Sequence, residues 1–372
     1  MMAKSISLEI LNNKIFIKEI SEDLKNIFKI EIEDLSHDEY VVLKEYLKNI
    51  NIEIKRSVNN NYEINFIFNQ NEIIDDKNPF INKILEIINK YKNYSSPIKI
   101  NSKILDFKKT YIMGILNVTP DSFYDGGRFF EKEKAVAHAL KMVNEGVDII
   151  DIGGESTRPG SDRISEEEEI KRVIPVIKEI RKNSDVIISI DTYKSKVAEE
   201  ALSAGADIVN DISGCIADEK MPDIIKSYGV PVIVMHIRGN PKIMQRDVHY
   251  NDVVKDIIRS LRNRINYLKL RGINEEKIII DPGIGFGKTV DDNIRIIKRL
   301  KEFRCLGRPI LIGPSRKSFI GKILDLPPEE RLEGTLAVLA LCIINGANII
   351  RVHDVKEAVR VAKIIDYIKF LT

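Results

Sequence analysis

Short apolar runs in this sequence end repeatedly in side chains that can do chemistry. Asp191 and Asp281 each close such a run, and Lys317 follows another closely. A carboxylate set against apolar chain lies in a low local dielectric, where it strongly stabilises a nearby positive charge. The polar groups at or just beyond run ends are Asn117, Asp151, Glu155, Asp191, Asn210, Asp211, His236, Asp281, Ser315, Arg316, Lys317, Arg351, His353 and Asp354. Their recurrence predicts a binding or catalytic site.

The types of these side chains describe a ligand. Asp191, Asn210 and Asp281 can accept hydrogen bonds from a flat heterocycle that is rich in N–H donors. A second set suits a phosphate or pyrophosphate, because it combines an amide, two permanent cations and an imidazole. That second set is Asn117, Lys317, Arg351 and His353. The predicted ligand is therefore a donor-rich ring that carries an anionic tail.

Individual residues have simpler alternatives. An Asp that follows a strand is often only the N-cap of the next helix, and this is an equal alternative for Asp151 or Asp211 taken alone. An isolated His236 is more often a packed, hydrogen-bonded residue than a catalyst. The segment 282–289 nearly matches a nucleotide phosphate loop, but Pro282 stands where that pattern needs its first glycine, which disfavours the interpretation.

The elements that must position these groups form a repeat. Short β-branched runs alternate with segments of helical periodicity, as in parallel strands covered on both faces. The runs are 111–118, 148–153, 186–191, 208–212, 231–236, 278–281, 309–313 and 348–352. The helical segments are 133–145, 165–182, 194–204, 219–228 (the weakest), 253–271, 291–303, 329–345 and 355–370. Eight such units over about 265 residues predict a (β/α)₈ TIM barrel, whose active site lies at the C-terminal strand ends. An open doubly wound sheet is the alternative.

Residues 1–100 differ in composition from the rest of the chain. They contain no glycine and two prolines, whereas glycine is frequent afterwards. We expect a small N-terminal α/β domain at 1–100 and the barrel domain at 101–372, with 92–99 as a linker. Its predicted strands are 5–11, 52–56 and 62–68, and its predicted helices are 37–48 and 79–91. It carries no chemical motif, which favours a structural or oligomerisation role.

The overall composition excludes several classes of protein. The formal net charge is +2, from 58 basic and 56 acidic residues, so a nucleic-acid partner is not expected. The three cysteines lie far apart with no CxxC pair, which argues against a disulfide framework or a thiolate zinc site. No signal peptide is recognisable at the N-terminus, and the longest late apolar stretch, 336–344, is too short to cross a bilayer. We expect a cytoplasmic protein with no membrane partner.

Several motifs give the barrel segment a specific resemblance. They are MGILNVTPDSF at 113–123, DIGGESTRPG at 151–160, SIDT at 189–192, VNDISG at 209–214, DPGIGFG at 281–287, SRKSFIG at 315–321 and RVHDV at 351–355. From about residue 110 to its end, the chain resembles the dihydropteroate synthases, which join a pterin pyrophosphate to p-aminobenzoate and release pyrophosphate in folate biosynthesis.

The resemblance implies roles for matching positions. It implies that Asp191, Asp281 and Lys317 are catalytic. The pterin-binding residues that it implies are Asp191, Asn210, Met235, Asp281, Phe286 and Lys317. The pyrophosphate residues that it implies are Asn117, Arg351 and His353, with Mg²⁺ bridging the phosphates and Asn117 as the metal ligand. It further implies a p-aminobenzoate pocket of Thr157, Arg158, Pro159, Lys317 and Ser318, mobile loops at 123–130 and 156–163, and a homodimer.

Some positions depart from the family pattern and leave alternatives. Tyr124 replaces a small residue, and 236–241 reads HIRGNP where the family has an HMRGTP-like motif. Both departures concern the second substrate, so a different aromatic amine is the most serious alternative. A methyltransferase that acts between a reduced folate and a corrinoid protein would not need Lys317 or the Arg351 and His353 pair. A non-catalytic pterin-binding protein should have lost some of these residues.

Overall fold

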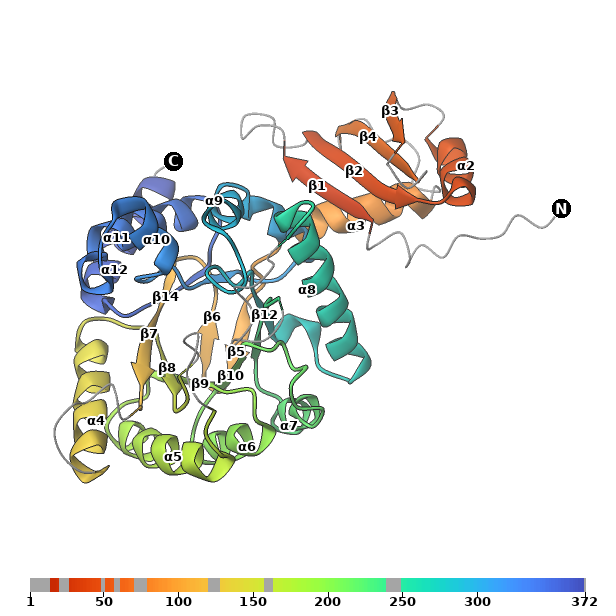
Figure 1. The fold of residues 1–372 in the computed structure, drawn as a ribbon. Coiled ribbons are helices and arrows are strands. Elements are labelled where there is room, and N and C mark those ends of the chain that lie inside the picture. The colour runs from red at the N-terminus through yellow and green to blue at the C-terminus, as the bar shows by residue number, and fades with distance from the viewer. Residues whose placement is uncertain are drawn as a thin grey trace.

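The computed structural model describes residues 14–19, 27–47, 51–56, 61–69, 79–119, 128–156, 163–238 and 249–370. Figure 1 shows a barrel ringed by helices and, beside it, a smaller sheet with two helices. The predicted strand at 5–11 lies outside the described residues, as do Tyr124 and most of the loops at 123–130 and 156–163.

The larger sheet is parallel and closes on itself. Its hydrogen-bonded strand order is β12-β11-β10-β9-β8-β7-β14-β13, and a parallel bridge between Ile280 and Ile310 joins the two ends. The strands are β7 (Tyr111–Asn117), β8 (Ile149–Gly153), β9 (Ile187–Asp191), β10 (Ile208–Asp211), β11 (Val232–Met235), β12 (Ile278–Asp281), β13 (Leu311–Ile312) and β14 (Ile349–Val352). The predicted TIM barrel is confirmed.

A helical segment follows each strand and covers the outside of the sheet. These segments are α4 (Arg128–Asn144), α5 (Glu166–Asn183), α6 (Ser195–Ser203), α7 (Met221–Tyr228), α8 (Val253–Leu270), α9 (Val290–Lys298) with η4 (Leu300–Leu306), α10 (Ser318–Leu324) with α11 (Leu332–Ile344), and α12 (Val355–Phe370). Two short 3₁₀ turns, η3 (Glu275–Lys277) and η5 (Pro328–Glu330), complete the set.

Two helix predictions were wrong in detail. The single helix expected at 291–303 breaks at Arg299, which leaves helical geometry at φ −108° and ψ 20° while its guanidinium pairs with Asp252 and Glu302. The helix expected at 329–345 begins only at Leu332, and α10 before it was not predicted at all.

Strand alternation arranges the barrel interior in layers. Side chains two residues apart on a strand share a face. A buried apolar layer takes one residue from each strand, and the short hairpin of β5 (Ile98–Ile100) and β6 (Lys103–Leu105) packs into the same cluster. The strand residues of this layer are Met113, Ile149, Ile187, Ile208, Ile233, Ile279, Leu311 and Ile349. The hairpin therefore closes the N-terminal end of the barrel.

The next interior layer, two residues further along each strand, is mostly polar. Its members include Asp151, Ser189, Asn210, Met235, Asp281 and Arg351. The layer lies at the C-terminal strand ends, above the closed apolar layer. The barrel interior therefore changes from apolar to polar within two residues along each strand. We call the apolar layer the floor, and the polar layer with the space above it the cup.

The N-terminal part folds as an antiparallel sheet in the order β1-β2-β4-β3, with two helices. Its elements are β1 (Ile15–Glu19), β2 (Ile27–Leu35), α2 (His37–Tyr46), β3 (Ile52–Arg56), β4 (Tyr62–Asn69) and α3 (Pro79–Lys92). The predicted strands at 52–56 and 62–68 match β3 and β4, whereas β1 and β2 were missed. The expected linker holds a buried Tyr94, whose hydroxyl donates to the Gly346 carbonyl at 3.1 Å. The domain division at residue 100 stays a prediction.

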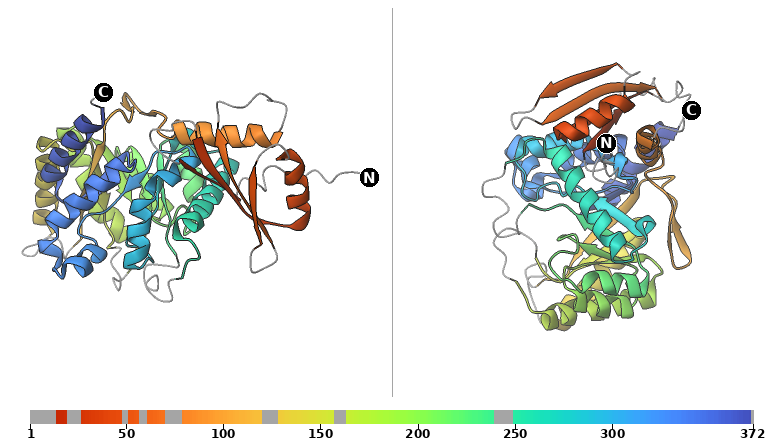
Figure 2. Two further views of the ribbon diagram at one scale, coloured as in Figure 1. Left: turned by 90° about the horizontal axis from the view of Figure 1, so that it is seen from above. Right: turned by 90° about the vertical axis from the view of Figure 1, so that its right-hand side faces the viewer.

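The N-terminal sheet packs along the side of the barrel, as Figures 1 and 2 show. The buried Arg262 of α8 donates to the Ile15 carbonyl at 3.2 Å and lies over the Phe16 ring. Lys255 pairs with Glu31 and Glu33 at 2.5 Å each. The contact is therefore both apolar and ionic.

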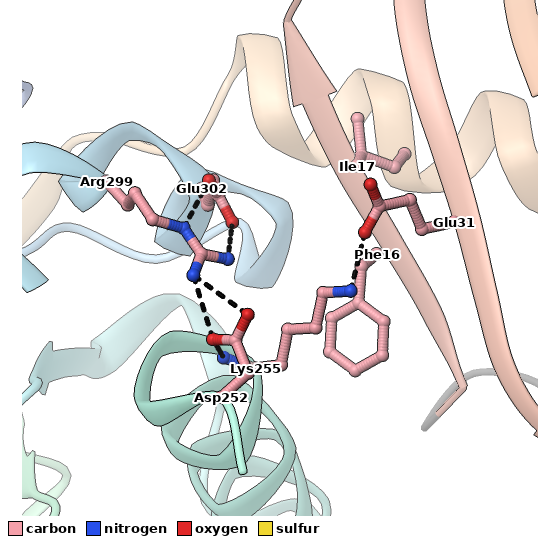
Figure 3. Close-up of a pocket in the computed structure, with 7 residues that line it drawn as sticks. All are labelled: Phe16, Ile17, Glu31, Asp252, Lys255, Arg299 and Glu302. Carbon is pink, nitrogen blue, oxygen red and sulfur yellow. Dashed lines mark hydrogen bonds and ion pairs between the residues drawn. The ribbon is translucent and has the colours of Figure 1, made fainter. Parts of the chain in front are cut away.

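A cavity of about 160 Å³ lies in this contact. Figure 3 shows that its charged groups already pair with one another: Lys255 with Glu31, and Arg299 with both Asp252 and Glu302. Since each of these charges has an ionic partner within the protein, the cavity offers little to a charged ligand. The chemistry lies instead at the rim of the barrel, by which we mean the C-terminal ends of its strands.

Candidate active site

The centre of the rim is an arginine shared by two carboxylates. Arg351 reaches Asp151 Oδ2 through Nε and Asp191 Oδ2 through Nη2, each at 2.6 Å. Asp151 is fully buried, and its Oδ2 also accepts from the Asn210 amide at 3.0 Å. Residues from β8, β9, β10 and β14 thus form one hydrogen-bonded network at the level of the polar layer.

One guanidinium in this network pairs with two carboxylates. Burial raises the pKa of Asp191 to about 7; Arg351 opposes that shift and the Asp151 charge adds to it. The two carboxylates hold the pKa of Arg351 above its ordinary value against the effect of burial. Because one guanidinium serves two carboxylates, a ligand that brings further donors to Asp191 gains a strong interaction.

Asp281 provides a second buried carboxylate on the other side of the polar layer. Its Oδ1 accepts from the Gly283 N–H at 2.7 Å. Burial raises the pKa of Asp281, and the Gly283 hydrogen bond and the charges of Lys317, Lys288 and Arg351 partly offset this effect. Met235 is the register partner of Asp281 on the adjacent strand. A donor-rich ring can lie between Asp281 and Asp191 above the apolar floor.

Lys317 reaches the rim because a glycine makes room for it. Gly285 has φ +83°, and a Cβ at that position would lie 2.9 Å from the Lys317 Cδ. The Lys317 ammonium sits 4.2 Å from the centre of the Phe286 ring. Burial and the charge of Arg351 lower the pKa of Lys317 to about 8. An aromatic face and a cation therefore lie together above the polar layer.

His353 is oriented by Ser315. Its backbone N–H donates to Ser315 Oγ at 3.2 Å, and that hydroxyl lies 2.9 Å from Nδ1. The hydroxyl therefore links the backbone and the ring of His353 and orients the imidazole. Burial and Arg351 lower the pKa of His353 to about 4, so the ring acts as a neutral donor.

Asn117 stands at the edge of the same group. Gly153 separates it from Asp191: a Cβ on Gly153 would lie 3.9 Å from Asn117 Oδ1 and 3.7 Å from Asp191 Oδ2. Ser318, at the start of α10, follows Lys317 and is exposed. Thr157, Arg158 and Pro159 lie outside the described residues. The structure thus brings together the predicted pterin and pyrophosphate residues but does not test the predicted p-aminobenzoate loop.

Known proteins resemble this chain in its barrel segment. A family model described as "Pterin binding enzyme" matches residues 113–353. The dihydropteroate synthase of Bacillus subtilis (strain 168) is 50% identical over 259 residues, which cover 70% of this chain and 88% of that protein. That of Clostridium beijerinckii is 50% identical over 273 residues, covering 73% and 99%.

The chain belongs to the dihydropteroate synthase family of pterin-binding enzymes.

Solved structures of the family align with the barrel. The dihydropteroate synthase of Clostridium difficile, solved in the presence of pteroic acid, is 48% identical with a TM-score of 0.67 and covers 70% of this chain and 97% of its own. The Xanthomonas albilineans enzyme, solved with 4-aminobenzoic acid, is 39% identical with a TM-score of 0.70, covering 75% and 100%. The present synthase is therefore a transferase of folate synthesis with a TIM-barrel core.

Several rim candidates of this synthase hold the scaffold together instead of facing the cup. Asp211 accepts from the backbone N–H groups of Ser213 and Cys215 in the turn after β10; the N-cap alternative for it was wrong, because the next helix, α7, has Lys220 as its N-cap. Asp354 pairs with Arg316 at 2.6 Å. These residues fix the loops that follow β10 and β14.

His236 is also a packed residue. Burial lowers its pKa to about 3, and its Nδ1 lies 3.2 Å from the ammonium of Lys288. Lys288 also donates to the Phe286 carbonyl at 2.8 Å. This contact joins the loop after β11 to the glycine-rich loop after β12 in the synthase.

Sequence reasoning assigned no specific role to two residues of the synthase, Asp151 and Lys194. Asp151 was given the N-cap alternative, yet it occupies the centre of the interior network. Its position two residues after Ile149, in the same register as the other interior residues, is a readable signal. Lys194, which was not singled out, links Glu155, Glu169 and the Ile164 carbonyl. Among the described residues, no helix is long and apolar enough to cross a membrane.

Proposed function

We propose that the rim of this synthase condenses 6-hydroxymethyl-7,8-dihydropterin pyrophosphate with p-aminobenzoate to give 7,8-dihydropteroate and pyrophosphate. The observation that supports it best is the polar cup, which combines the carboxylates of Asp191 and Asp281 with the donors Lys317, Arg351 and His353. A donor-rich ring fits the first group, and a pyrophosphate fits the second.

The pterin lies in the cup. Asp191, Asn210 and Asp281 accept hydrogen bonds from its N–H groups, while Met235, Phe286 and Lys317 border the ring. When the bond from the methylene carbon to the pyrophosphate oxygen breaks, positive charge spreads into the ring. The carboxylates stabilise that charge, and they act strongly because they are buried.

The pyrophosphate lies at the upper rim. Arg351 supplies a permanent positive charge and His353 supplies a neutral N–H, so both can stabilise the departing oxygens. The nitrogen of p-aminobenzoate forms the new bond to the methylene carbon and loses a proton. Thr157, Arg158, Pro159, Lys317 and Ser318 are the residues proposed to hold this second substrate. An aromatic amine needs no activated serine or cysteine to attack.

Magnesium fits this site as a partner of the substrate. Within the described residues, no three His, Cys, Asp or Glu side chains come together as a metal site. A single amide oxygen, that of Asn117, lies beside the side-chain-free Gly153. Mg²⁺ commonly keeps several waters and takes few protein ligands when substrate phosphates bind it, so Asn117 would suffice. When bound, the ion stabilises the charge of the leaving pyrophosphate.

A homodimer is supported by an exposed apolar face. Large apolar side chains on α11 and α12, two helices that pack together, are half exposed or more. They are Leu341, Ile344, Ile364, Tyr367 and Ile368. The N-terminal sheet packs against α8 and η4 instead, so a second copy of the chain can occupy this face.

The proposed reaction is tested with purified enzyme, the pterin pyrophosphate, p-aminobenzoate and Mg²⁺. We expect pyrophosphate and dihydropteroate to appear in equal amounts. Release of pyrophosphate without dihydropteroate would keep the pterin half of the proposal and reject p-aminobenzoate as the acceptor. Pterin binding without either product would reject the synthase reaction.

A further inference from the structure

We propose that Asp151 is a positioning residue that holds the guanidinium of Arg351 in place for pyrophosphate throughout the reaction. The inference rests on the proposed function, because it concerns how the residue assigned to pyrophosphate is oriented. Asp151 has no exposed surface, and its Oδ2 accepts from Arg351 Nε at 2.6 Å and from the Asn210 amide at 3.0 Å.

All side-chain hydrogen bonds that Asp151 makes within the described part of the chain go to residues of the proposed site. Both donors meet at Oδ2, and no protein group donates to Oδ1. A buried carboxylate usually takes donors at both oxygens, because an unmet acceptor costs stability. The side chain of Asp151 is thus committed to Arg351 and Asn210, both of which belong to the proposed site.

The second partner of Arg351 cannot serve the same purpose. Asp191 takes Nη2 of Arg351 at 2.6 Å, but the proposed mechanism gives the Asp191 carboxylate to the pterin N–H groups. Once the ring competes for Asp191, Asp151 is the carboxylate that still holds the guanidinium. It lies in the polar layer with no exposed surface, whereas 11% of the Asp191 side chain is exposed. Asp151 therefore keeps the guanidinium of Arg351 oriented toward the pyrophosphate while substrate is converted to product.

A second buried aspartate provides a matched control. Asp207 also pairs with an arginine, Arg181, at 2.6 Å, and it accepts from the Ile188 N–H and the Asn101 amide. It stands just before β10, at the closed end of the barrel, so its interactions do not reach the rim. Asp207→Asn removes a buried charge of the same kind without touching the proposed site.

The test is a double-mutant cycle on product inhibition by pyrophosphate, measured in the full-length enzyme with Mg²⁺. We expect Asp151→Asn to raise the inhibition constant about 10-fold, as for residues coupled in one network. In an Arg351→Ala background the same change should add less than about 2-fold, because the residue through which Asp151 acts is gone. Asp207→Asn should lower the Tm and leave the inhibition constant near that of the wild type.

Two outcomes would overturn the inference. One is an equal effect of Asp151→Asn with and without Arg351, and the other is an Asp151→Asn enzyme that behaves like Asp207→Asn. If Asp151→Asn does not fold, Arg351→Lys tests the same point, because a single ammonium cannot bridge both carboxylates as the guanidinium does. Wild-type inhibition in Arg351→Lys would then reject the inference. A wild-type enzyme without turnover would reject the proposed function itself.

Discussion

At the residue scale, the proposed mechanism depends most on the protonation state of Asp191. It shares Arg351 with Asp151, and burial raises its pKa to about 7. The carboxylate form, which accepts from the ring and stabilises positive charge, therefore forms only as pH rises through this range. The same shift acts on stability in the opposite sense: the contribution of Asp191 is full at low pH and is lost as pH rises through about 7.

We expect kcat/KM for the pterin pyrophosphate to rise with pH through an apparent pKa near 7 in the free enzyme. Asp191→Asn should lower kcat/KM by at least about 10-fold, because it loses a charged hydrogen bond of roughly 1.5–3 kcal/mol. Asp191→Asn should also remove the rise of kcat/KM with pH near 7. A pH–rate profile of both enzymes decides the matter. An unchanged limb in Asp191→Asn would assign the titration to another group.

Most of the interior residues could be predicted from the sequence because strand register repeats every two residues. Asp191, Asn210, Asp281 and Arg351 all lie at or near the ends of apolar runs, and the structure brings them together at the C-terminal ends of the strands. What the sequence could not supply was the partner of each charge. Asp151 and Arg351 lie 200 residues apart, so only the closure of the barrel makes them neighbours.

At the element scale, Lys194 joins the two ends of the loop between β8 and α5. Its ammonium donates to Glu155 at 2.6 Å, to Glu169 at 2.6 Å and to the Ile164 carbonyl at 2.8 Å. Tyr193 donates to the other oxygen of Glu155 at 2.7 Å. The segment between Glu155 and Ile164 contains the residues proposed to bind p-aminobenzoate. Lys194 therefore anchors that segment from β9–α6, three residues beyond Asp191.

We expect Lys194→Met to raise KM for p-aminobenzoate and to destabilise the protein by about 3–5 kcal/mol, because two buried carboxylates lose their cation. Lys196→Met is the control: Lys196 pairs with Glu167 at the surface at 3.3 Å, where such pairs contribute about 0–1 kcal/mol. Thermal unfolding and KM for both substrates are the measurements. Equal effects of the two variants would exclude the anchoring role.

The barrel was readable at the element scale, but its smaller parts were not. Eight apolar runs, each followed by a helical period, specify a repeating β/α unit. β5 and β6 have three residues each, too few for any period to be recognised. β2 differs, because its buried Phe28, Ile30 and Ile32 alternate with Lys29 and Glu31. That two-residue pattern was a usable signal which the prediction overlooked.

At the scale of the whole molecule, the N-terminal sheet and the apolar face lie on different sides of the barrel. The sheet contacts α8 and η4, and the apolar face belongs to α11 and α12. No sequence motif could have located either contact, because each depends on which helix faces the folded barrel leaves uncovered. The N-terminal unit thus adds to the synthase without covering the face proposed for dimerisation.

We expect the wild-type synthase to sediment as a dimer and the variant Ile364→Asp/Ile368→Asp to sediment as a monomer. A charge buried in an apolar interface loses its hydration without gaining a partner. Ile67→Asp, an exposed isoleucine of β4, should leave the dimer intact. Analytical ultracentrifugation distinguishes the species. A dimer that survives the double change but not Ile67→Asp would move the interface to the N-terminal sheet.

The hairpin that closes the N-terminal end of the barrel also has a consequence for the order in which substrates bind and products leave. Because Ile98, Ile100 and Leu105 fill that end in the described part of the chain, we expect substrates to enter and products to leave at the C-terminal ends of the strands. In the proposed arrangement the pterin lies deepest. The pterin pyrophosphate must therefore bind before the arylamine, and dihydropteroate must leave after pyrophosphate. Pyrophosphate that dissociates slowly from the rim would then delay the release of dihydropteroate. We therefore expect product release, as well as bond formation, to limit the turnover of this enzyme.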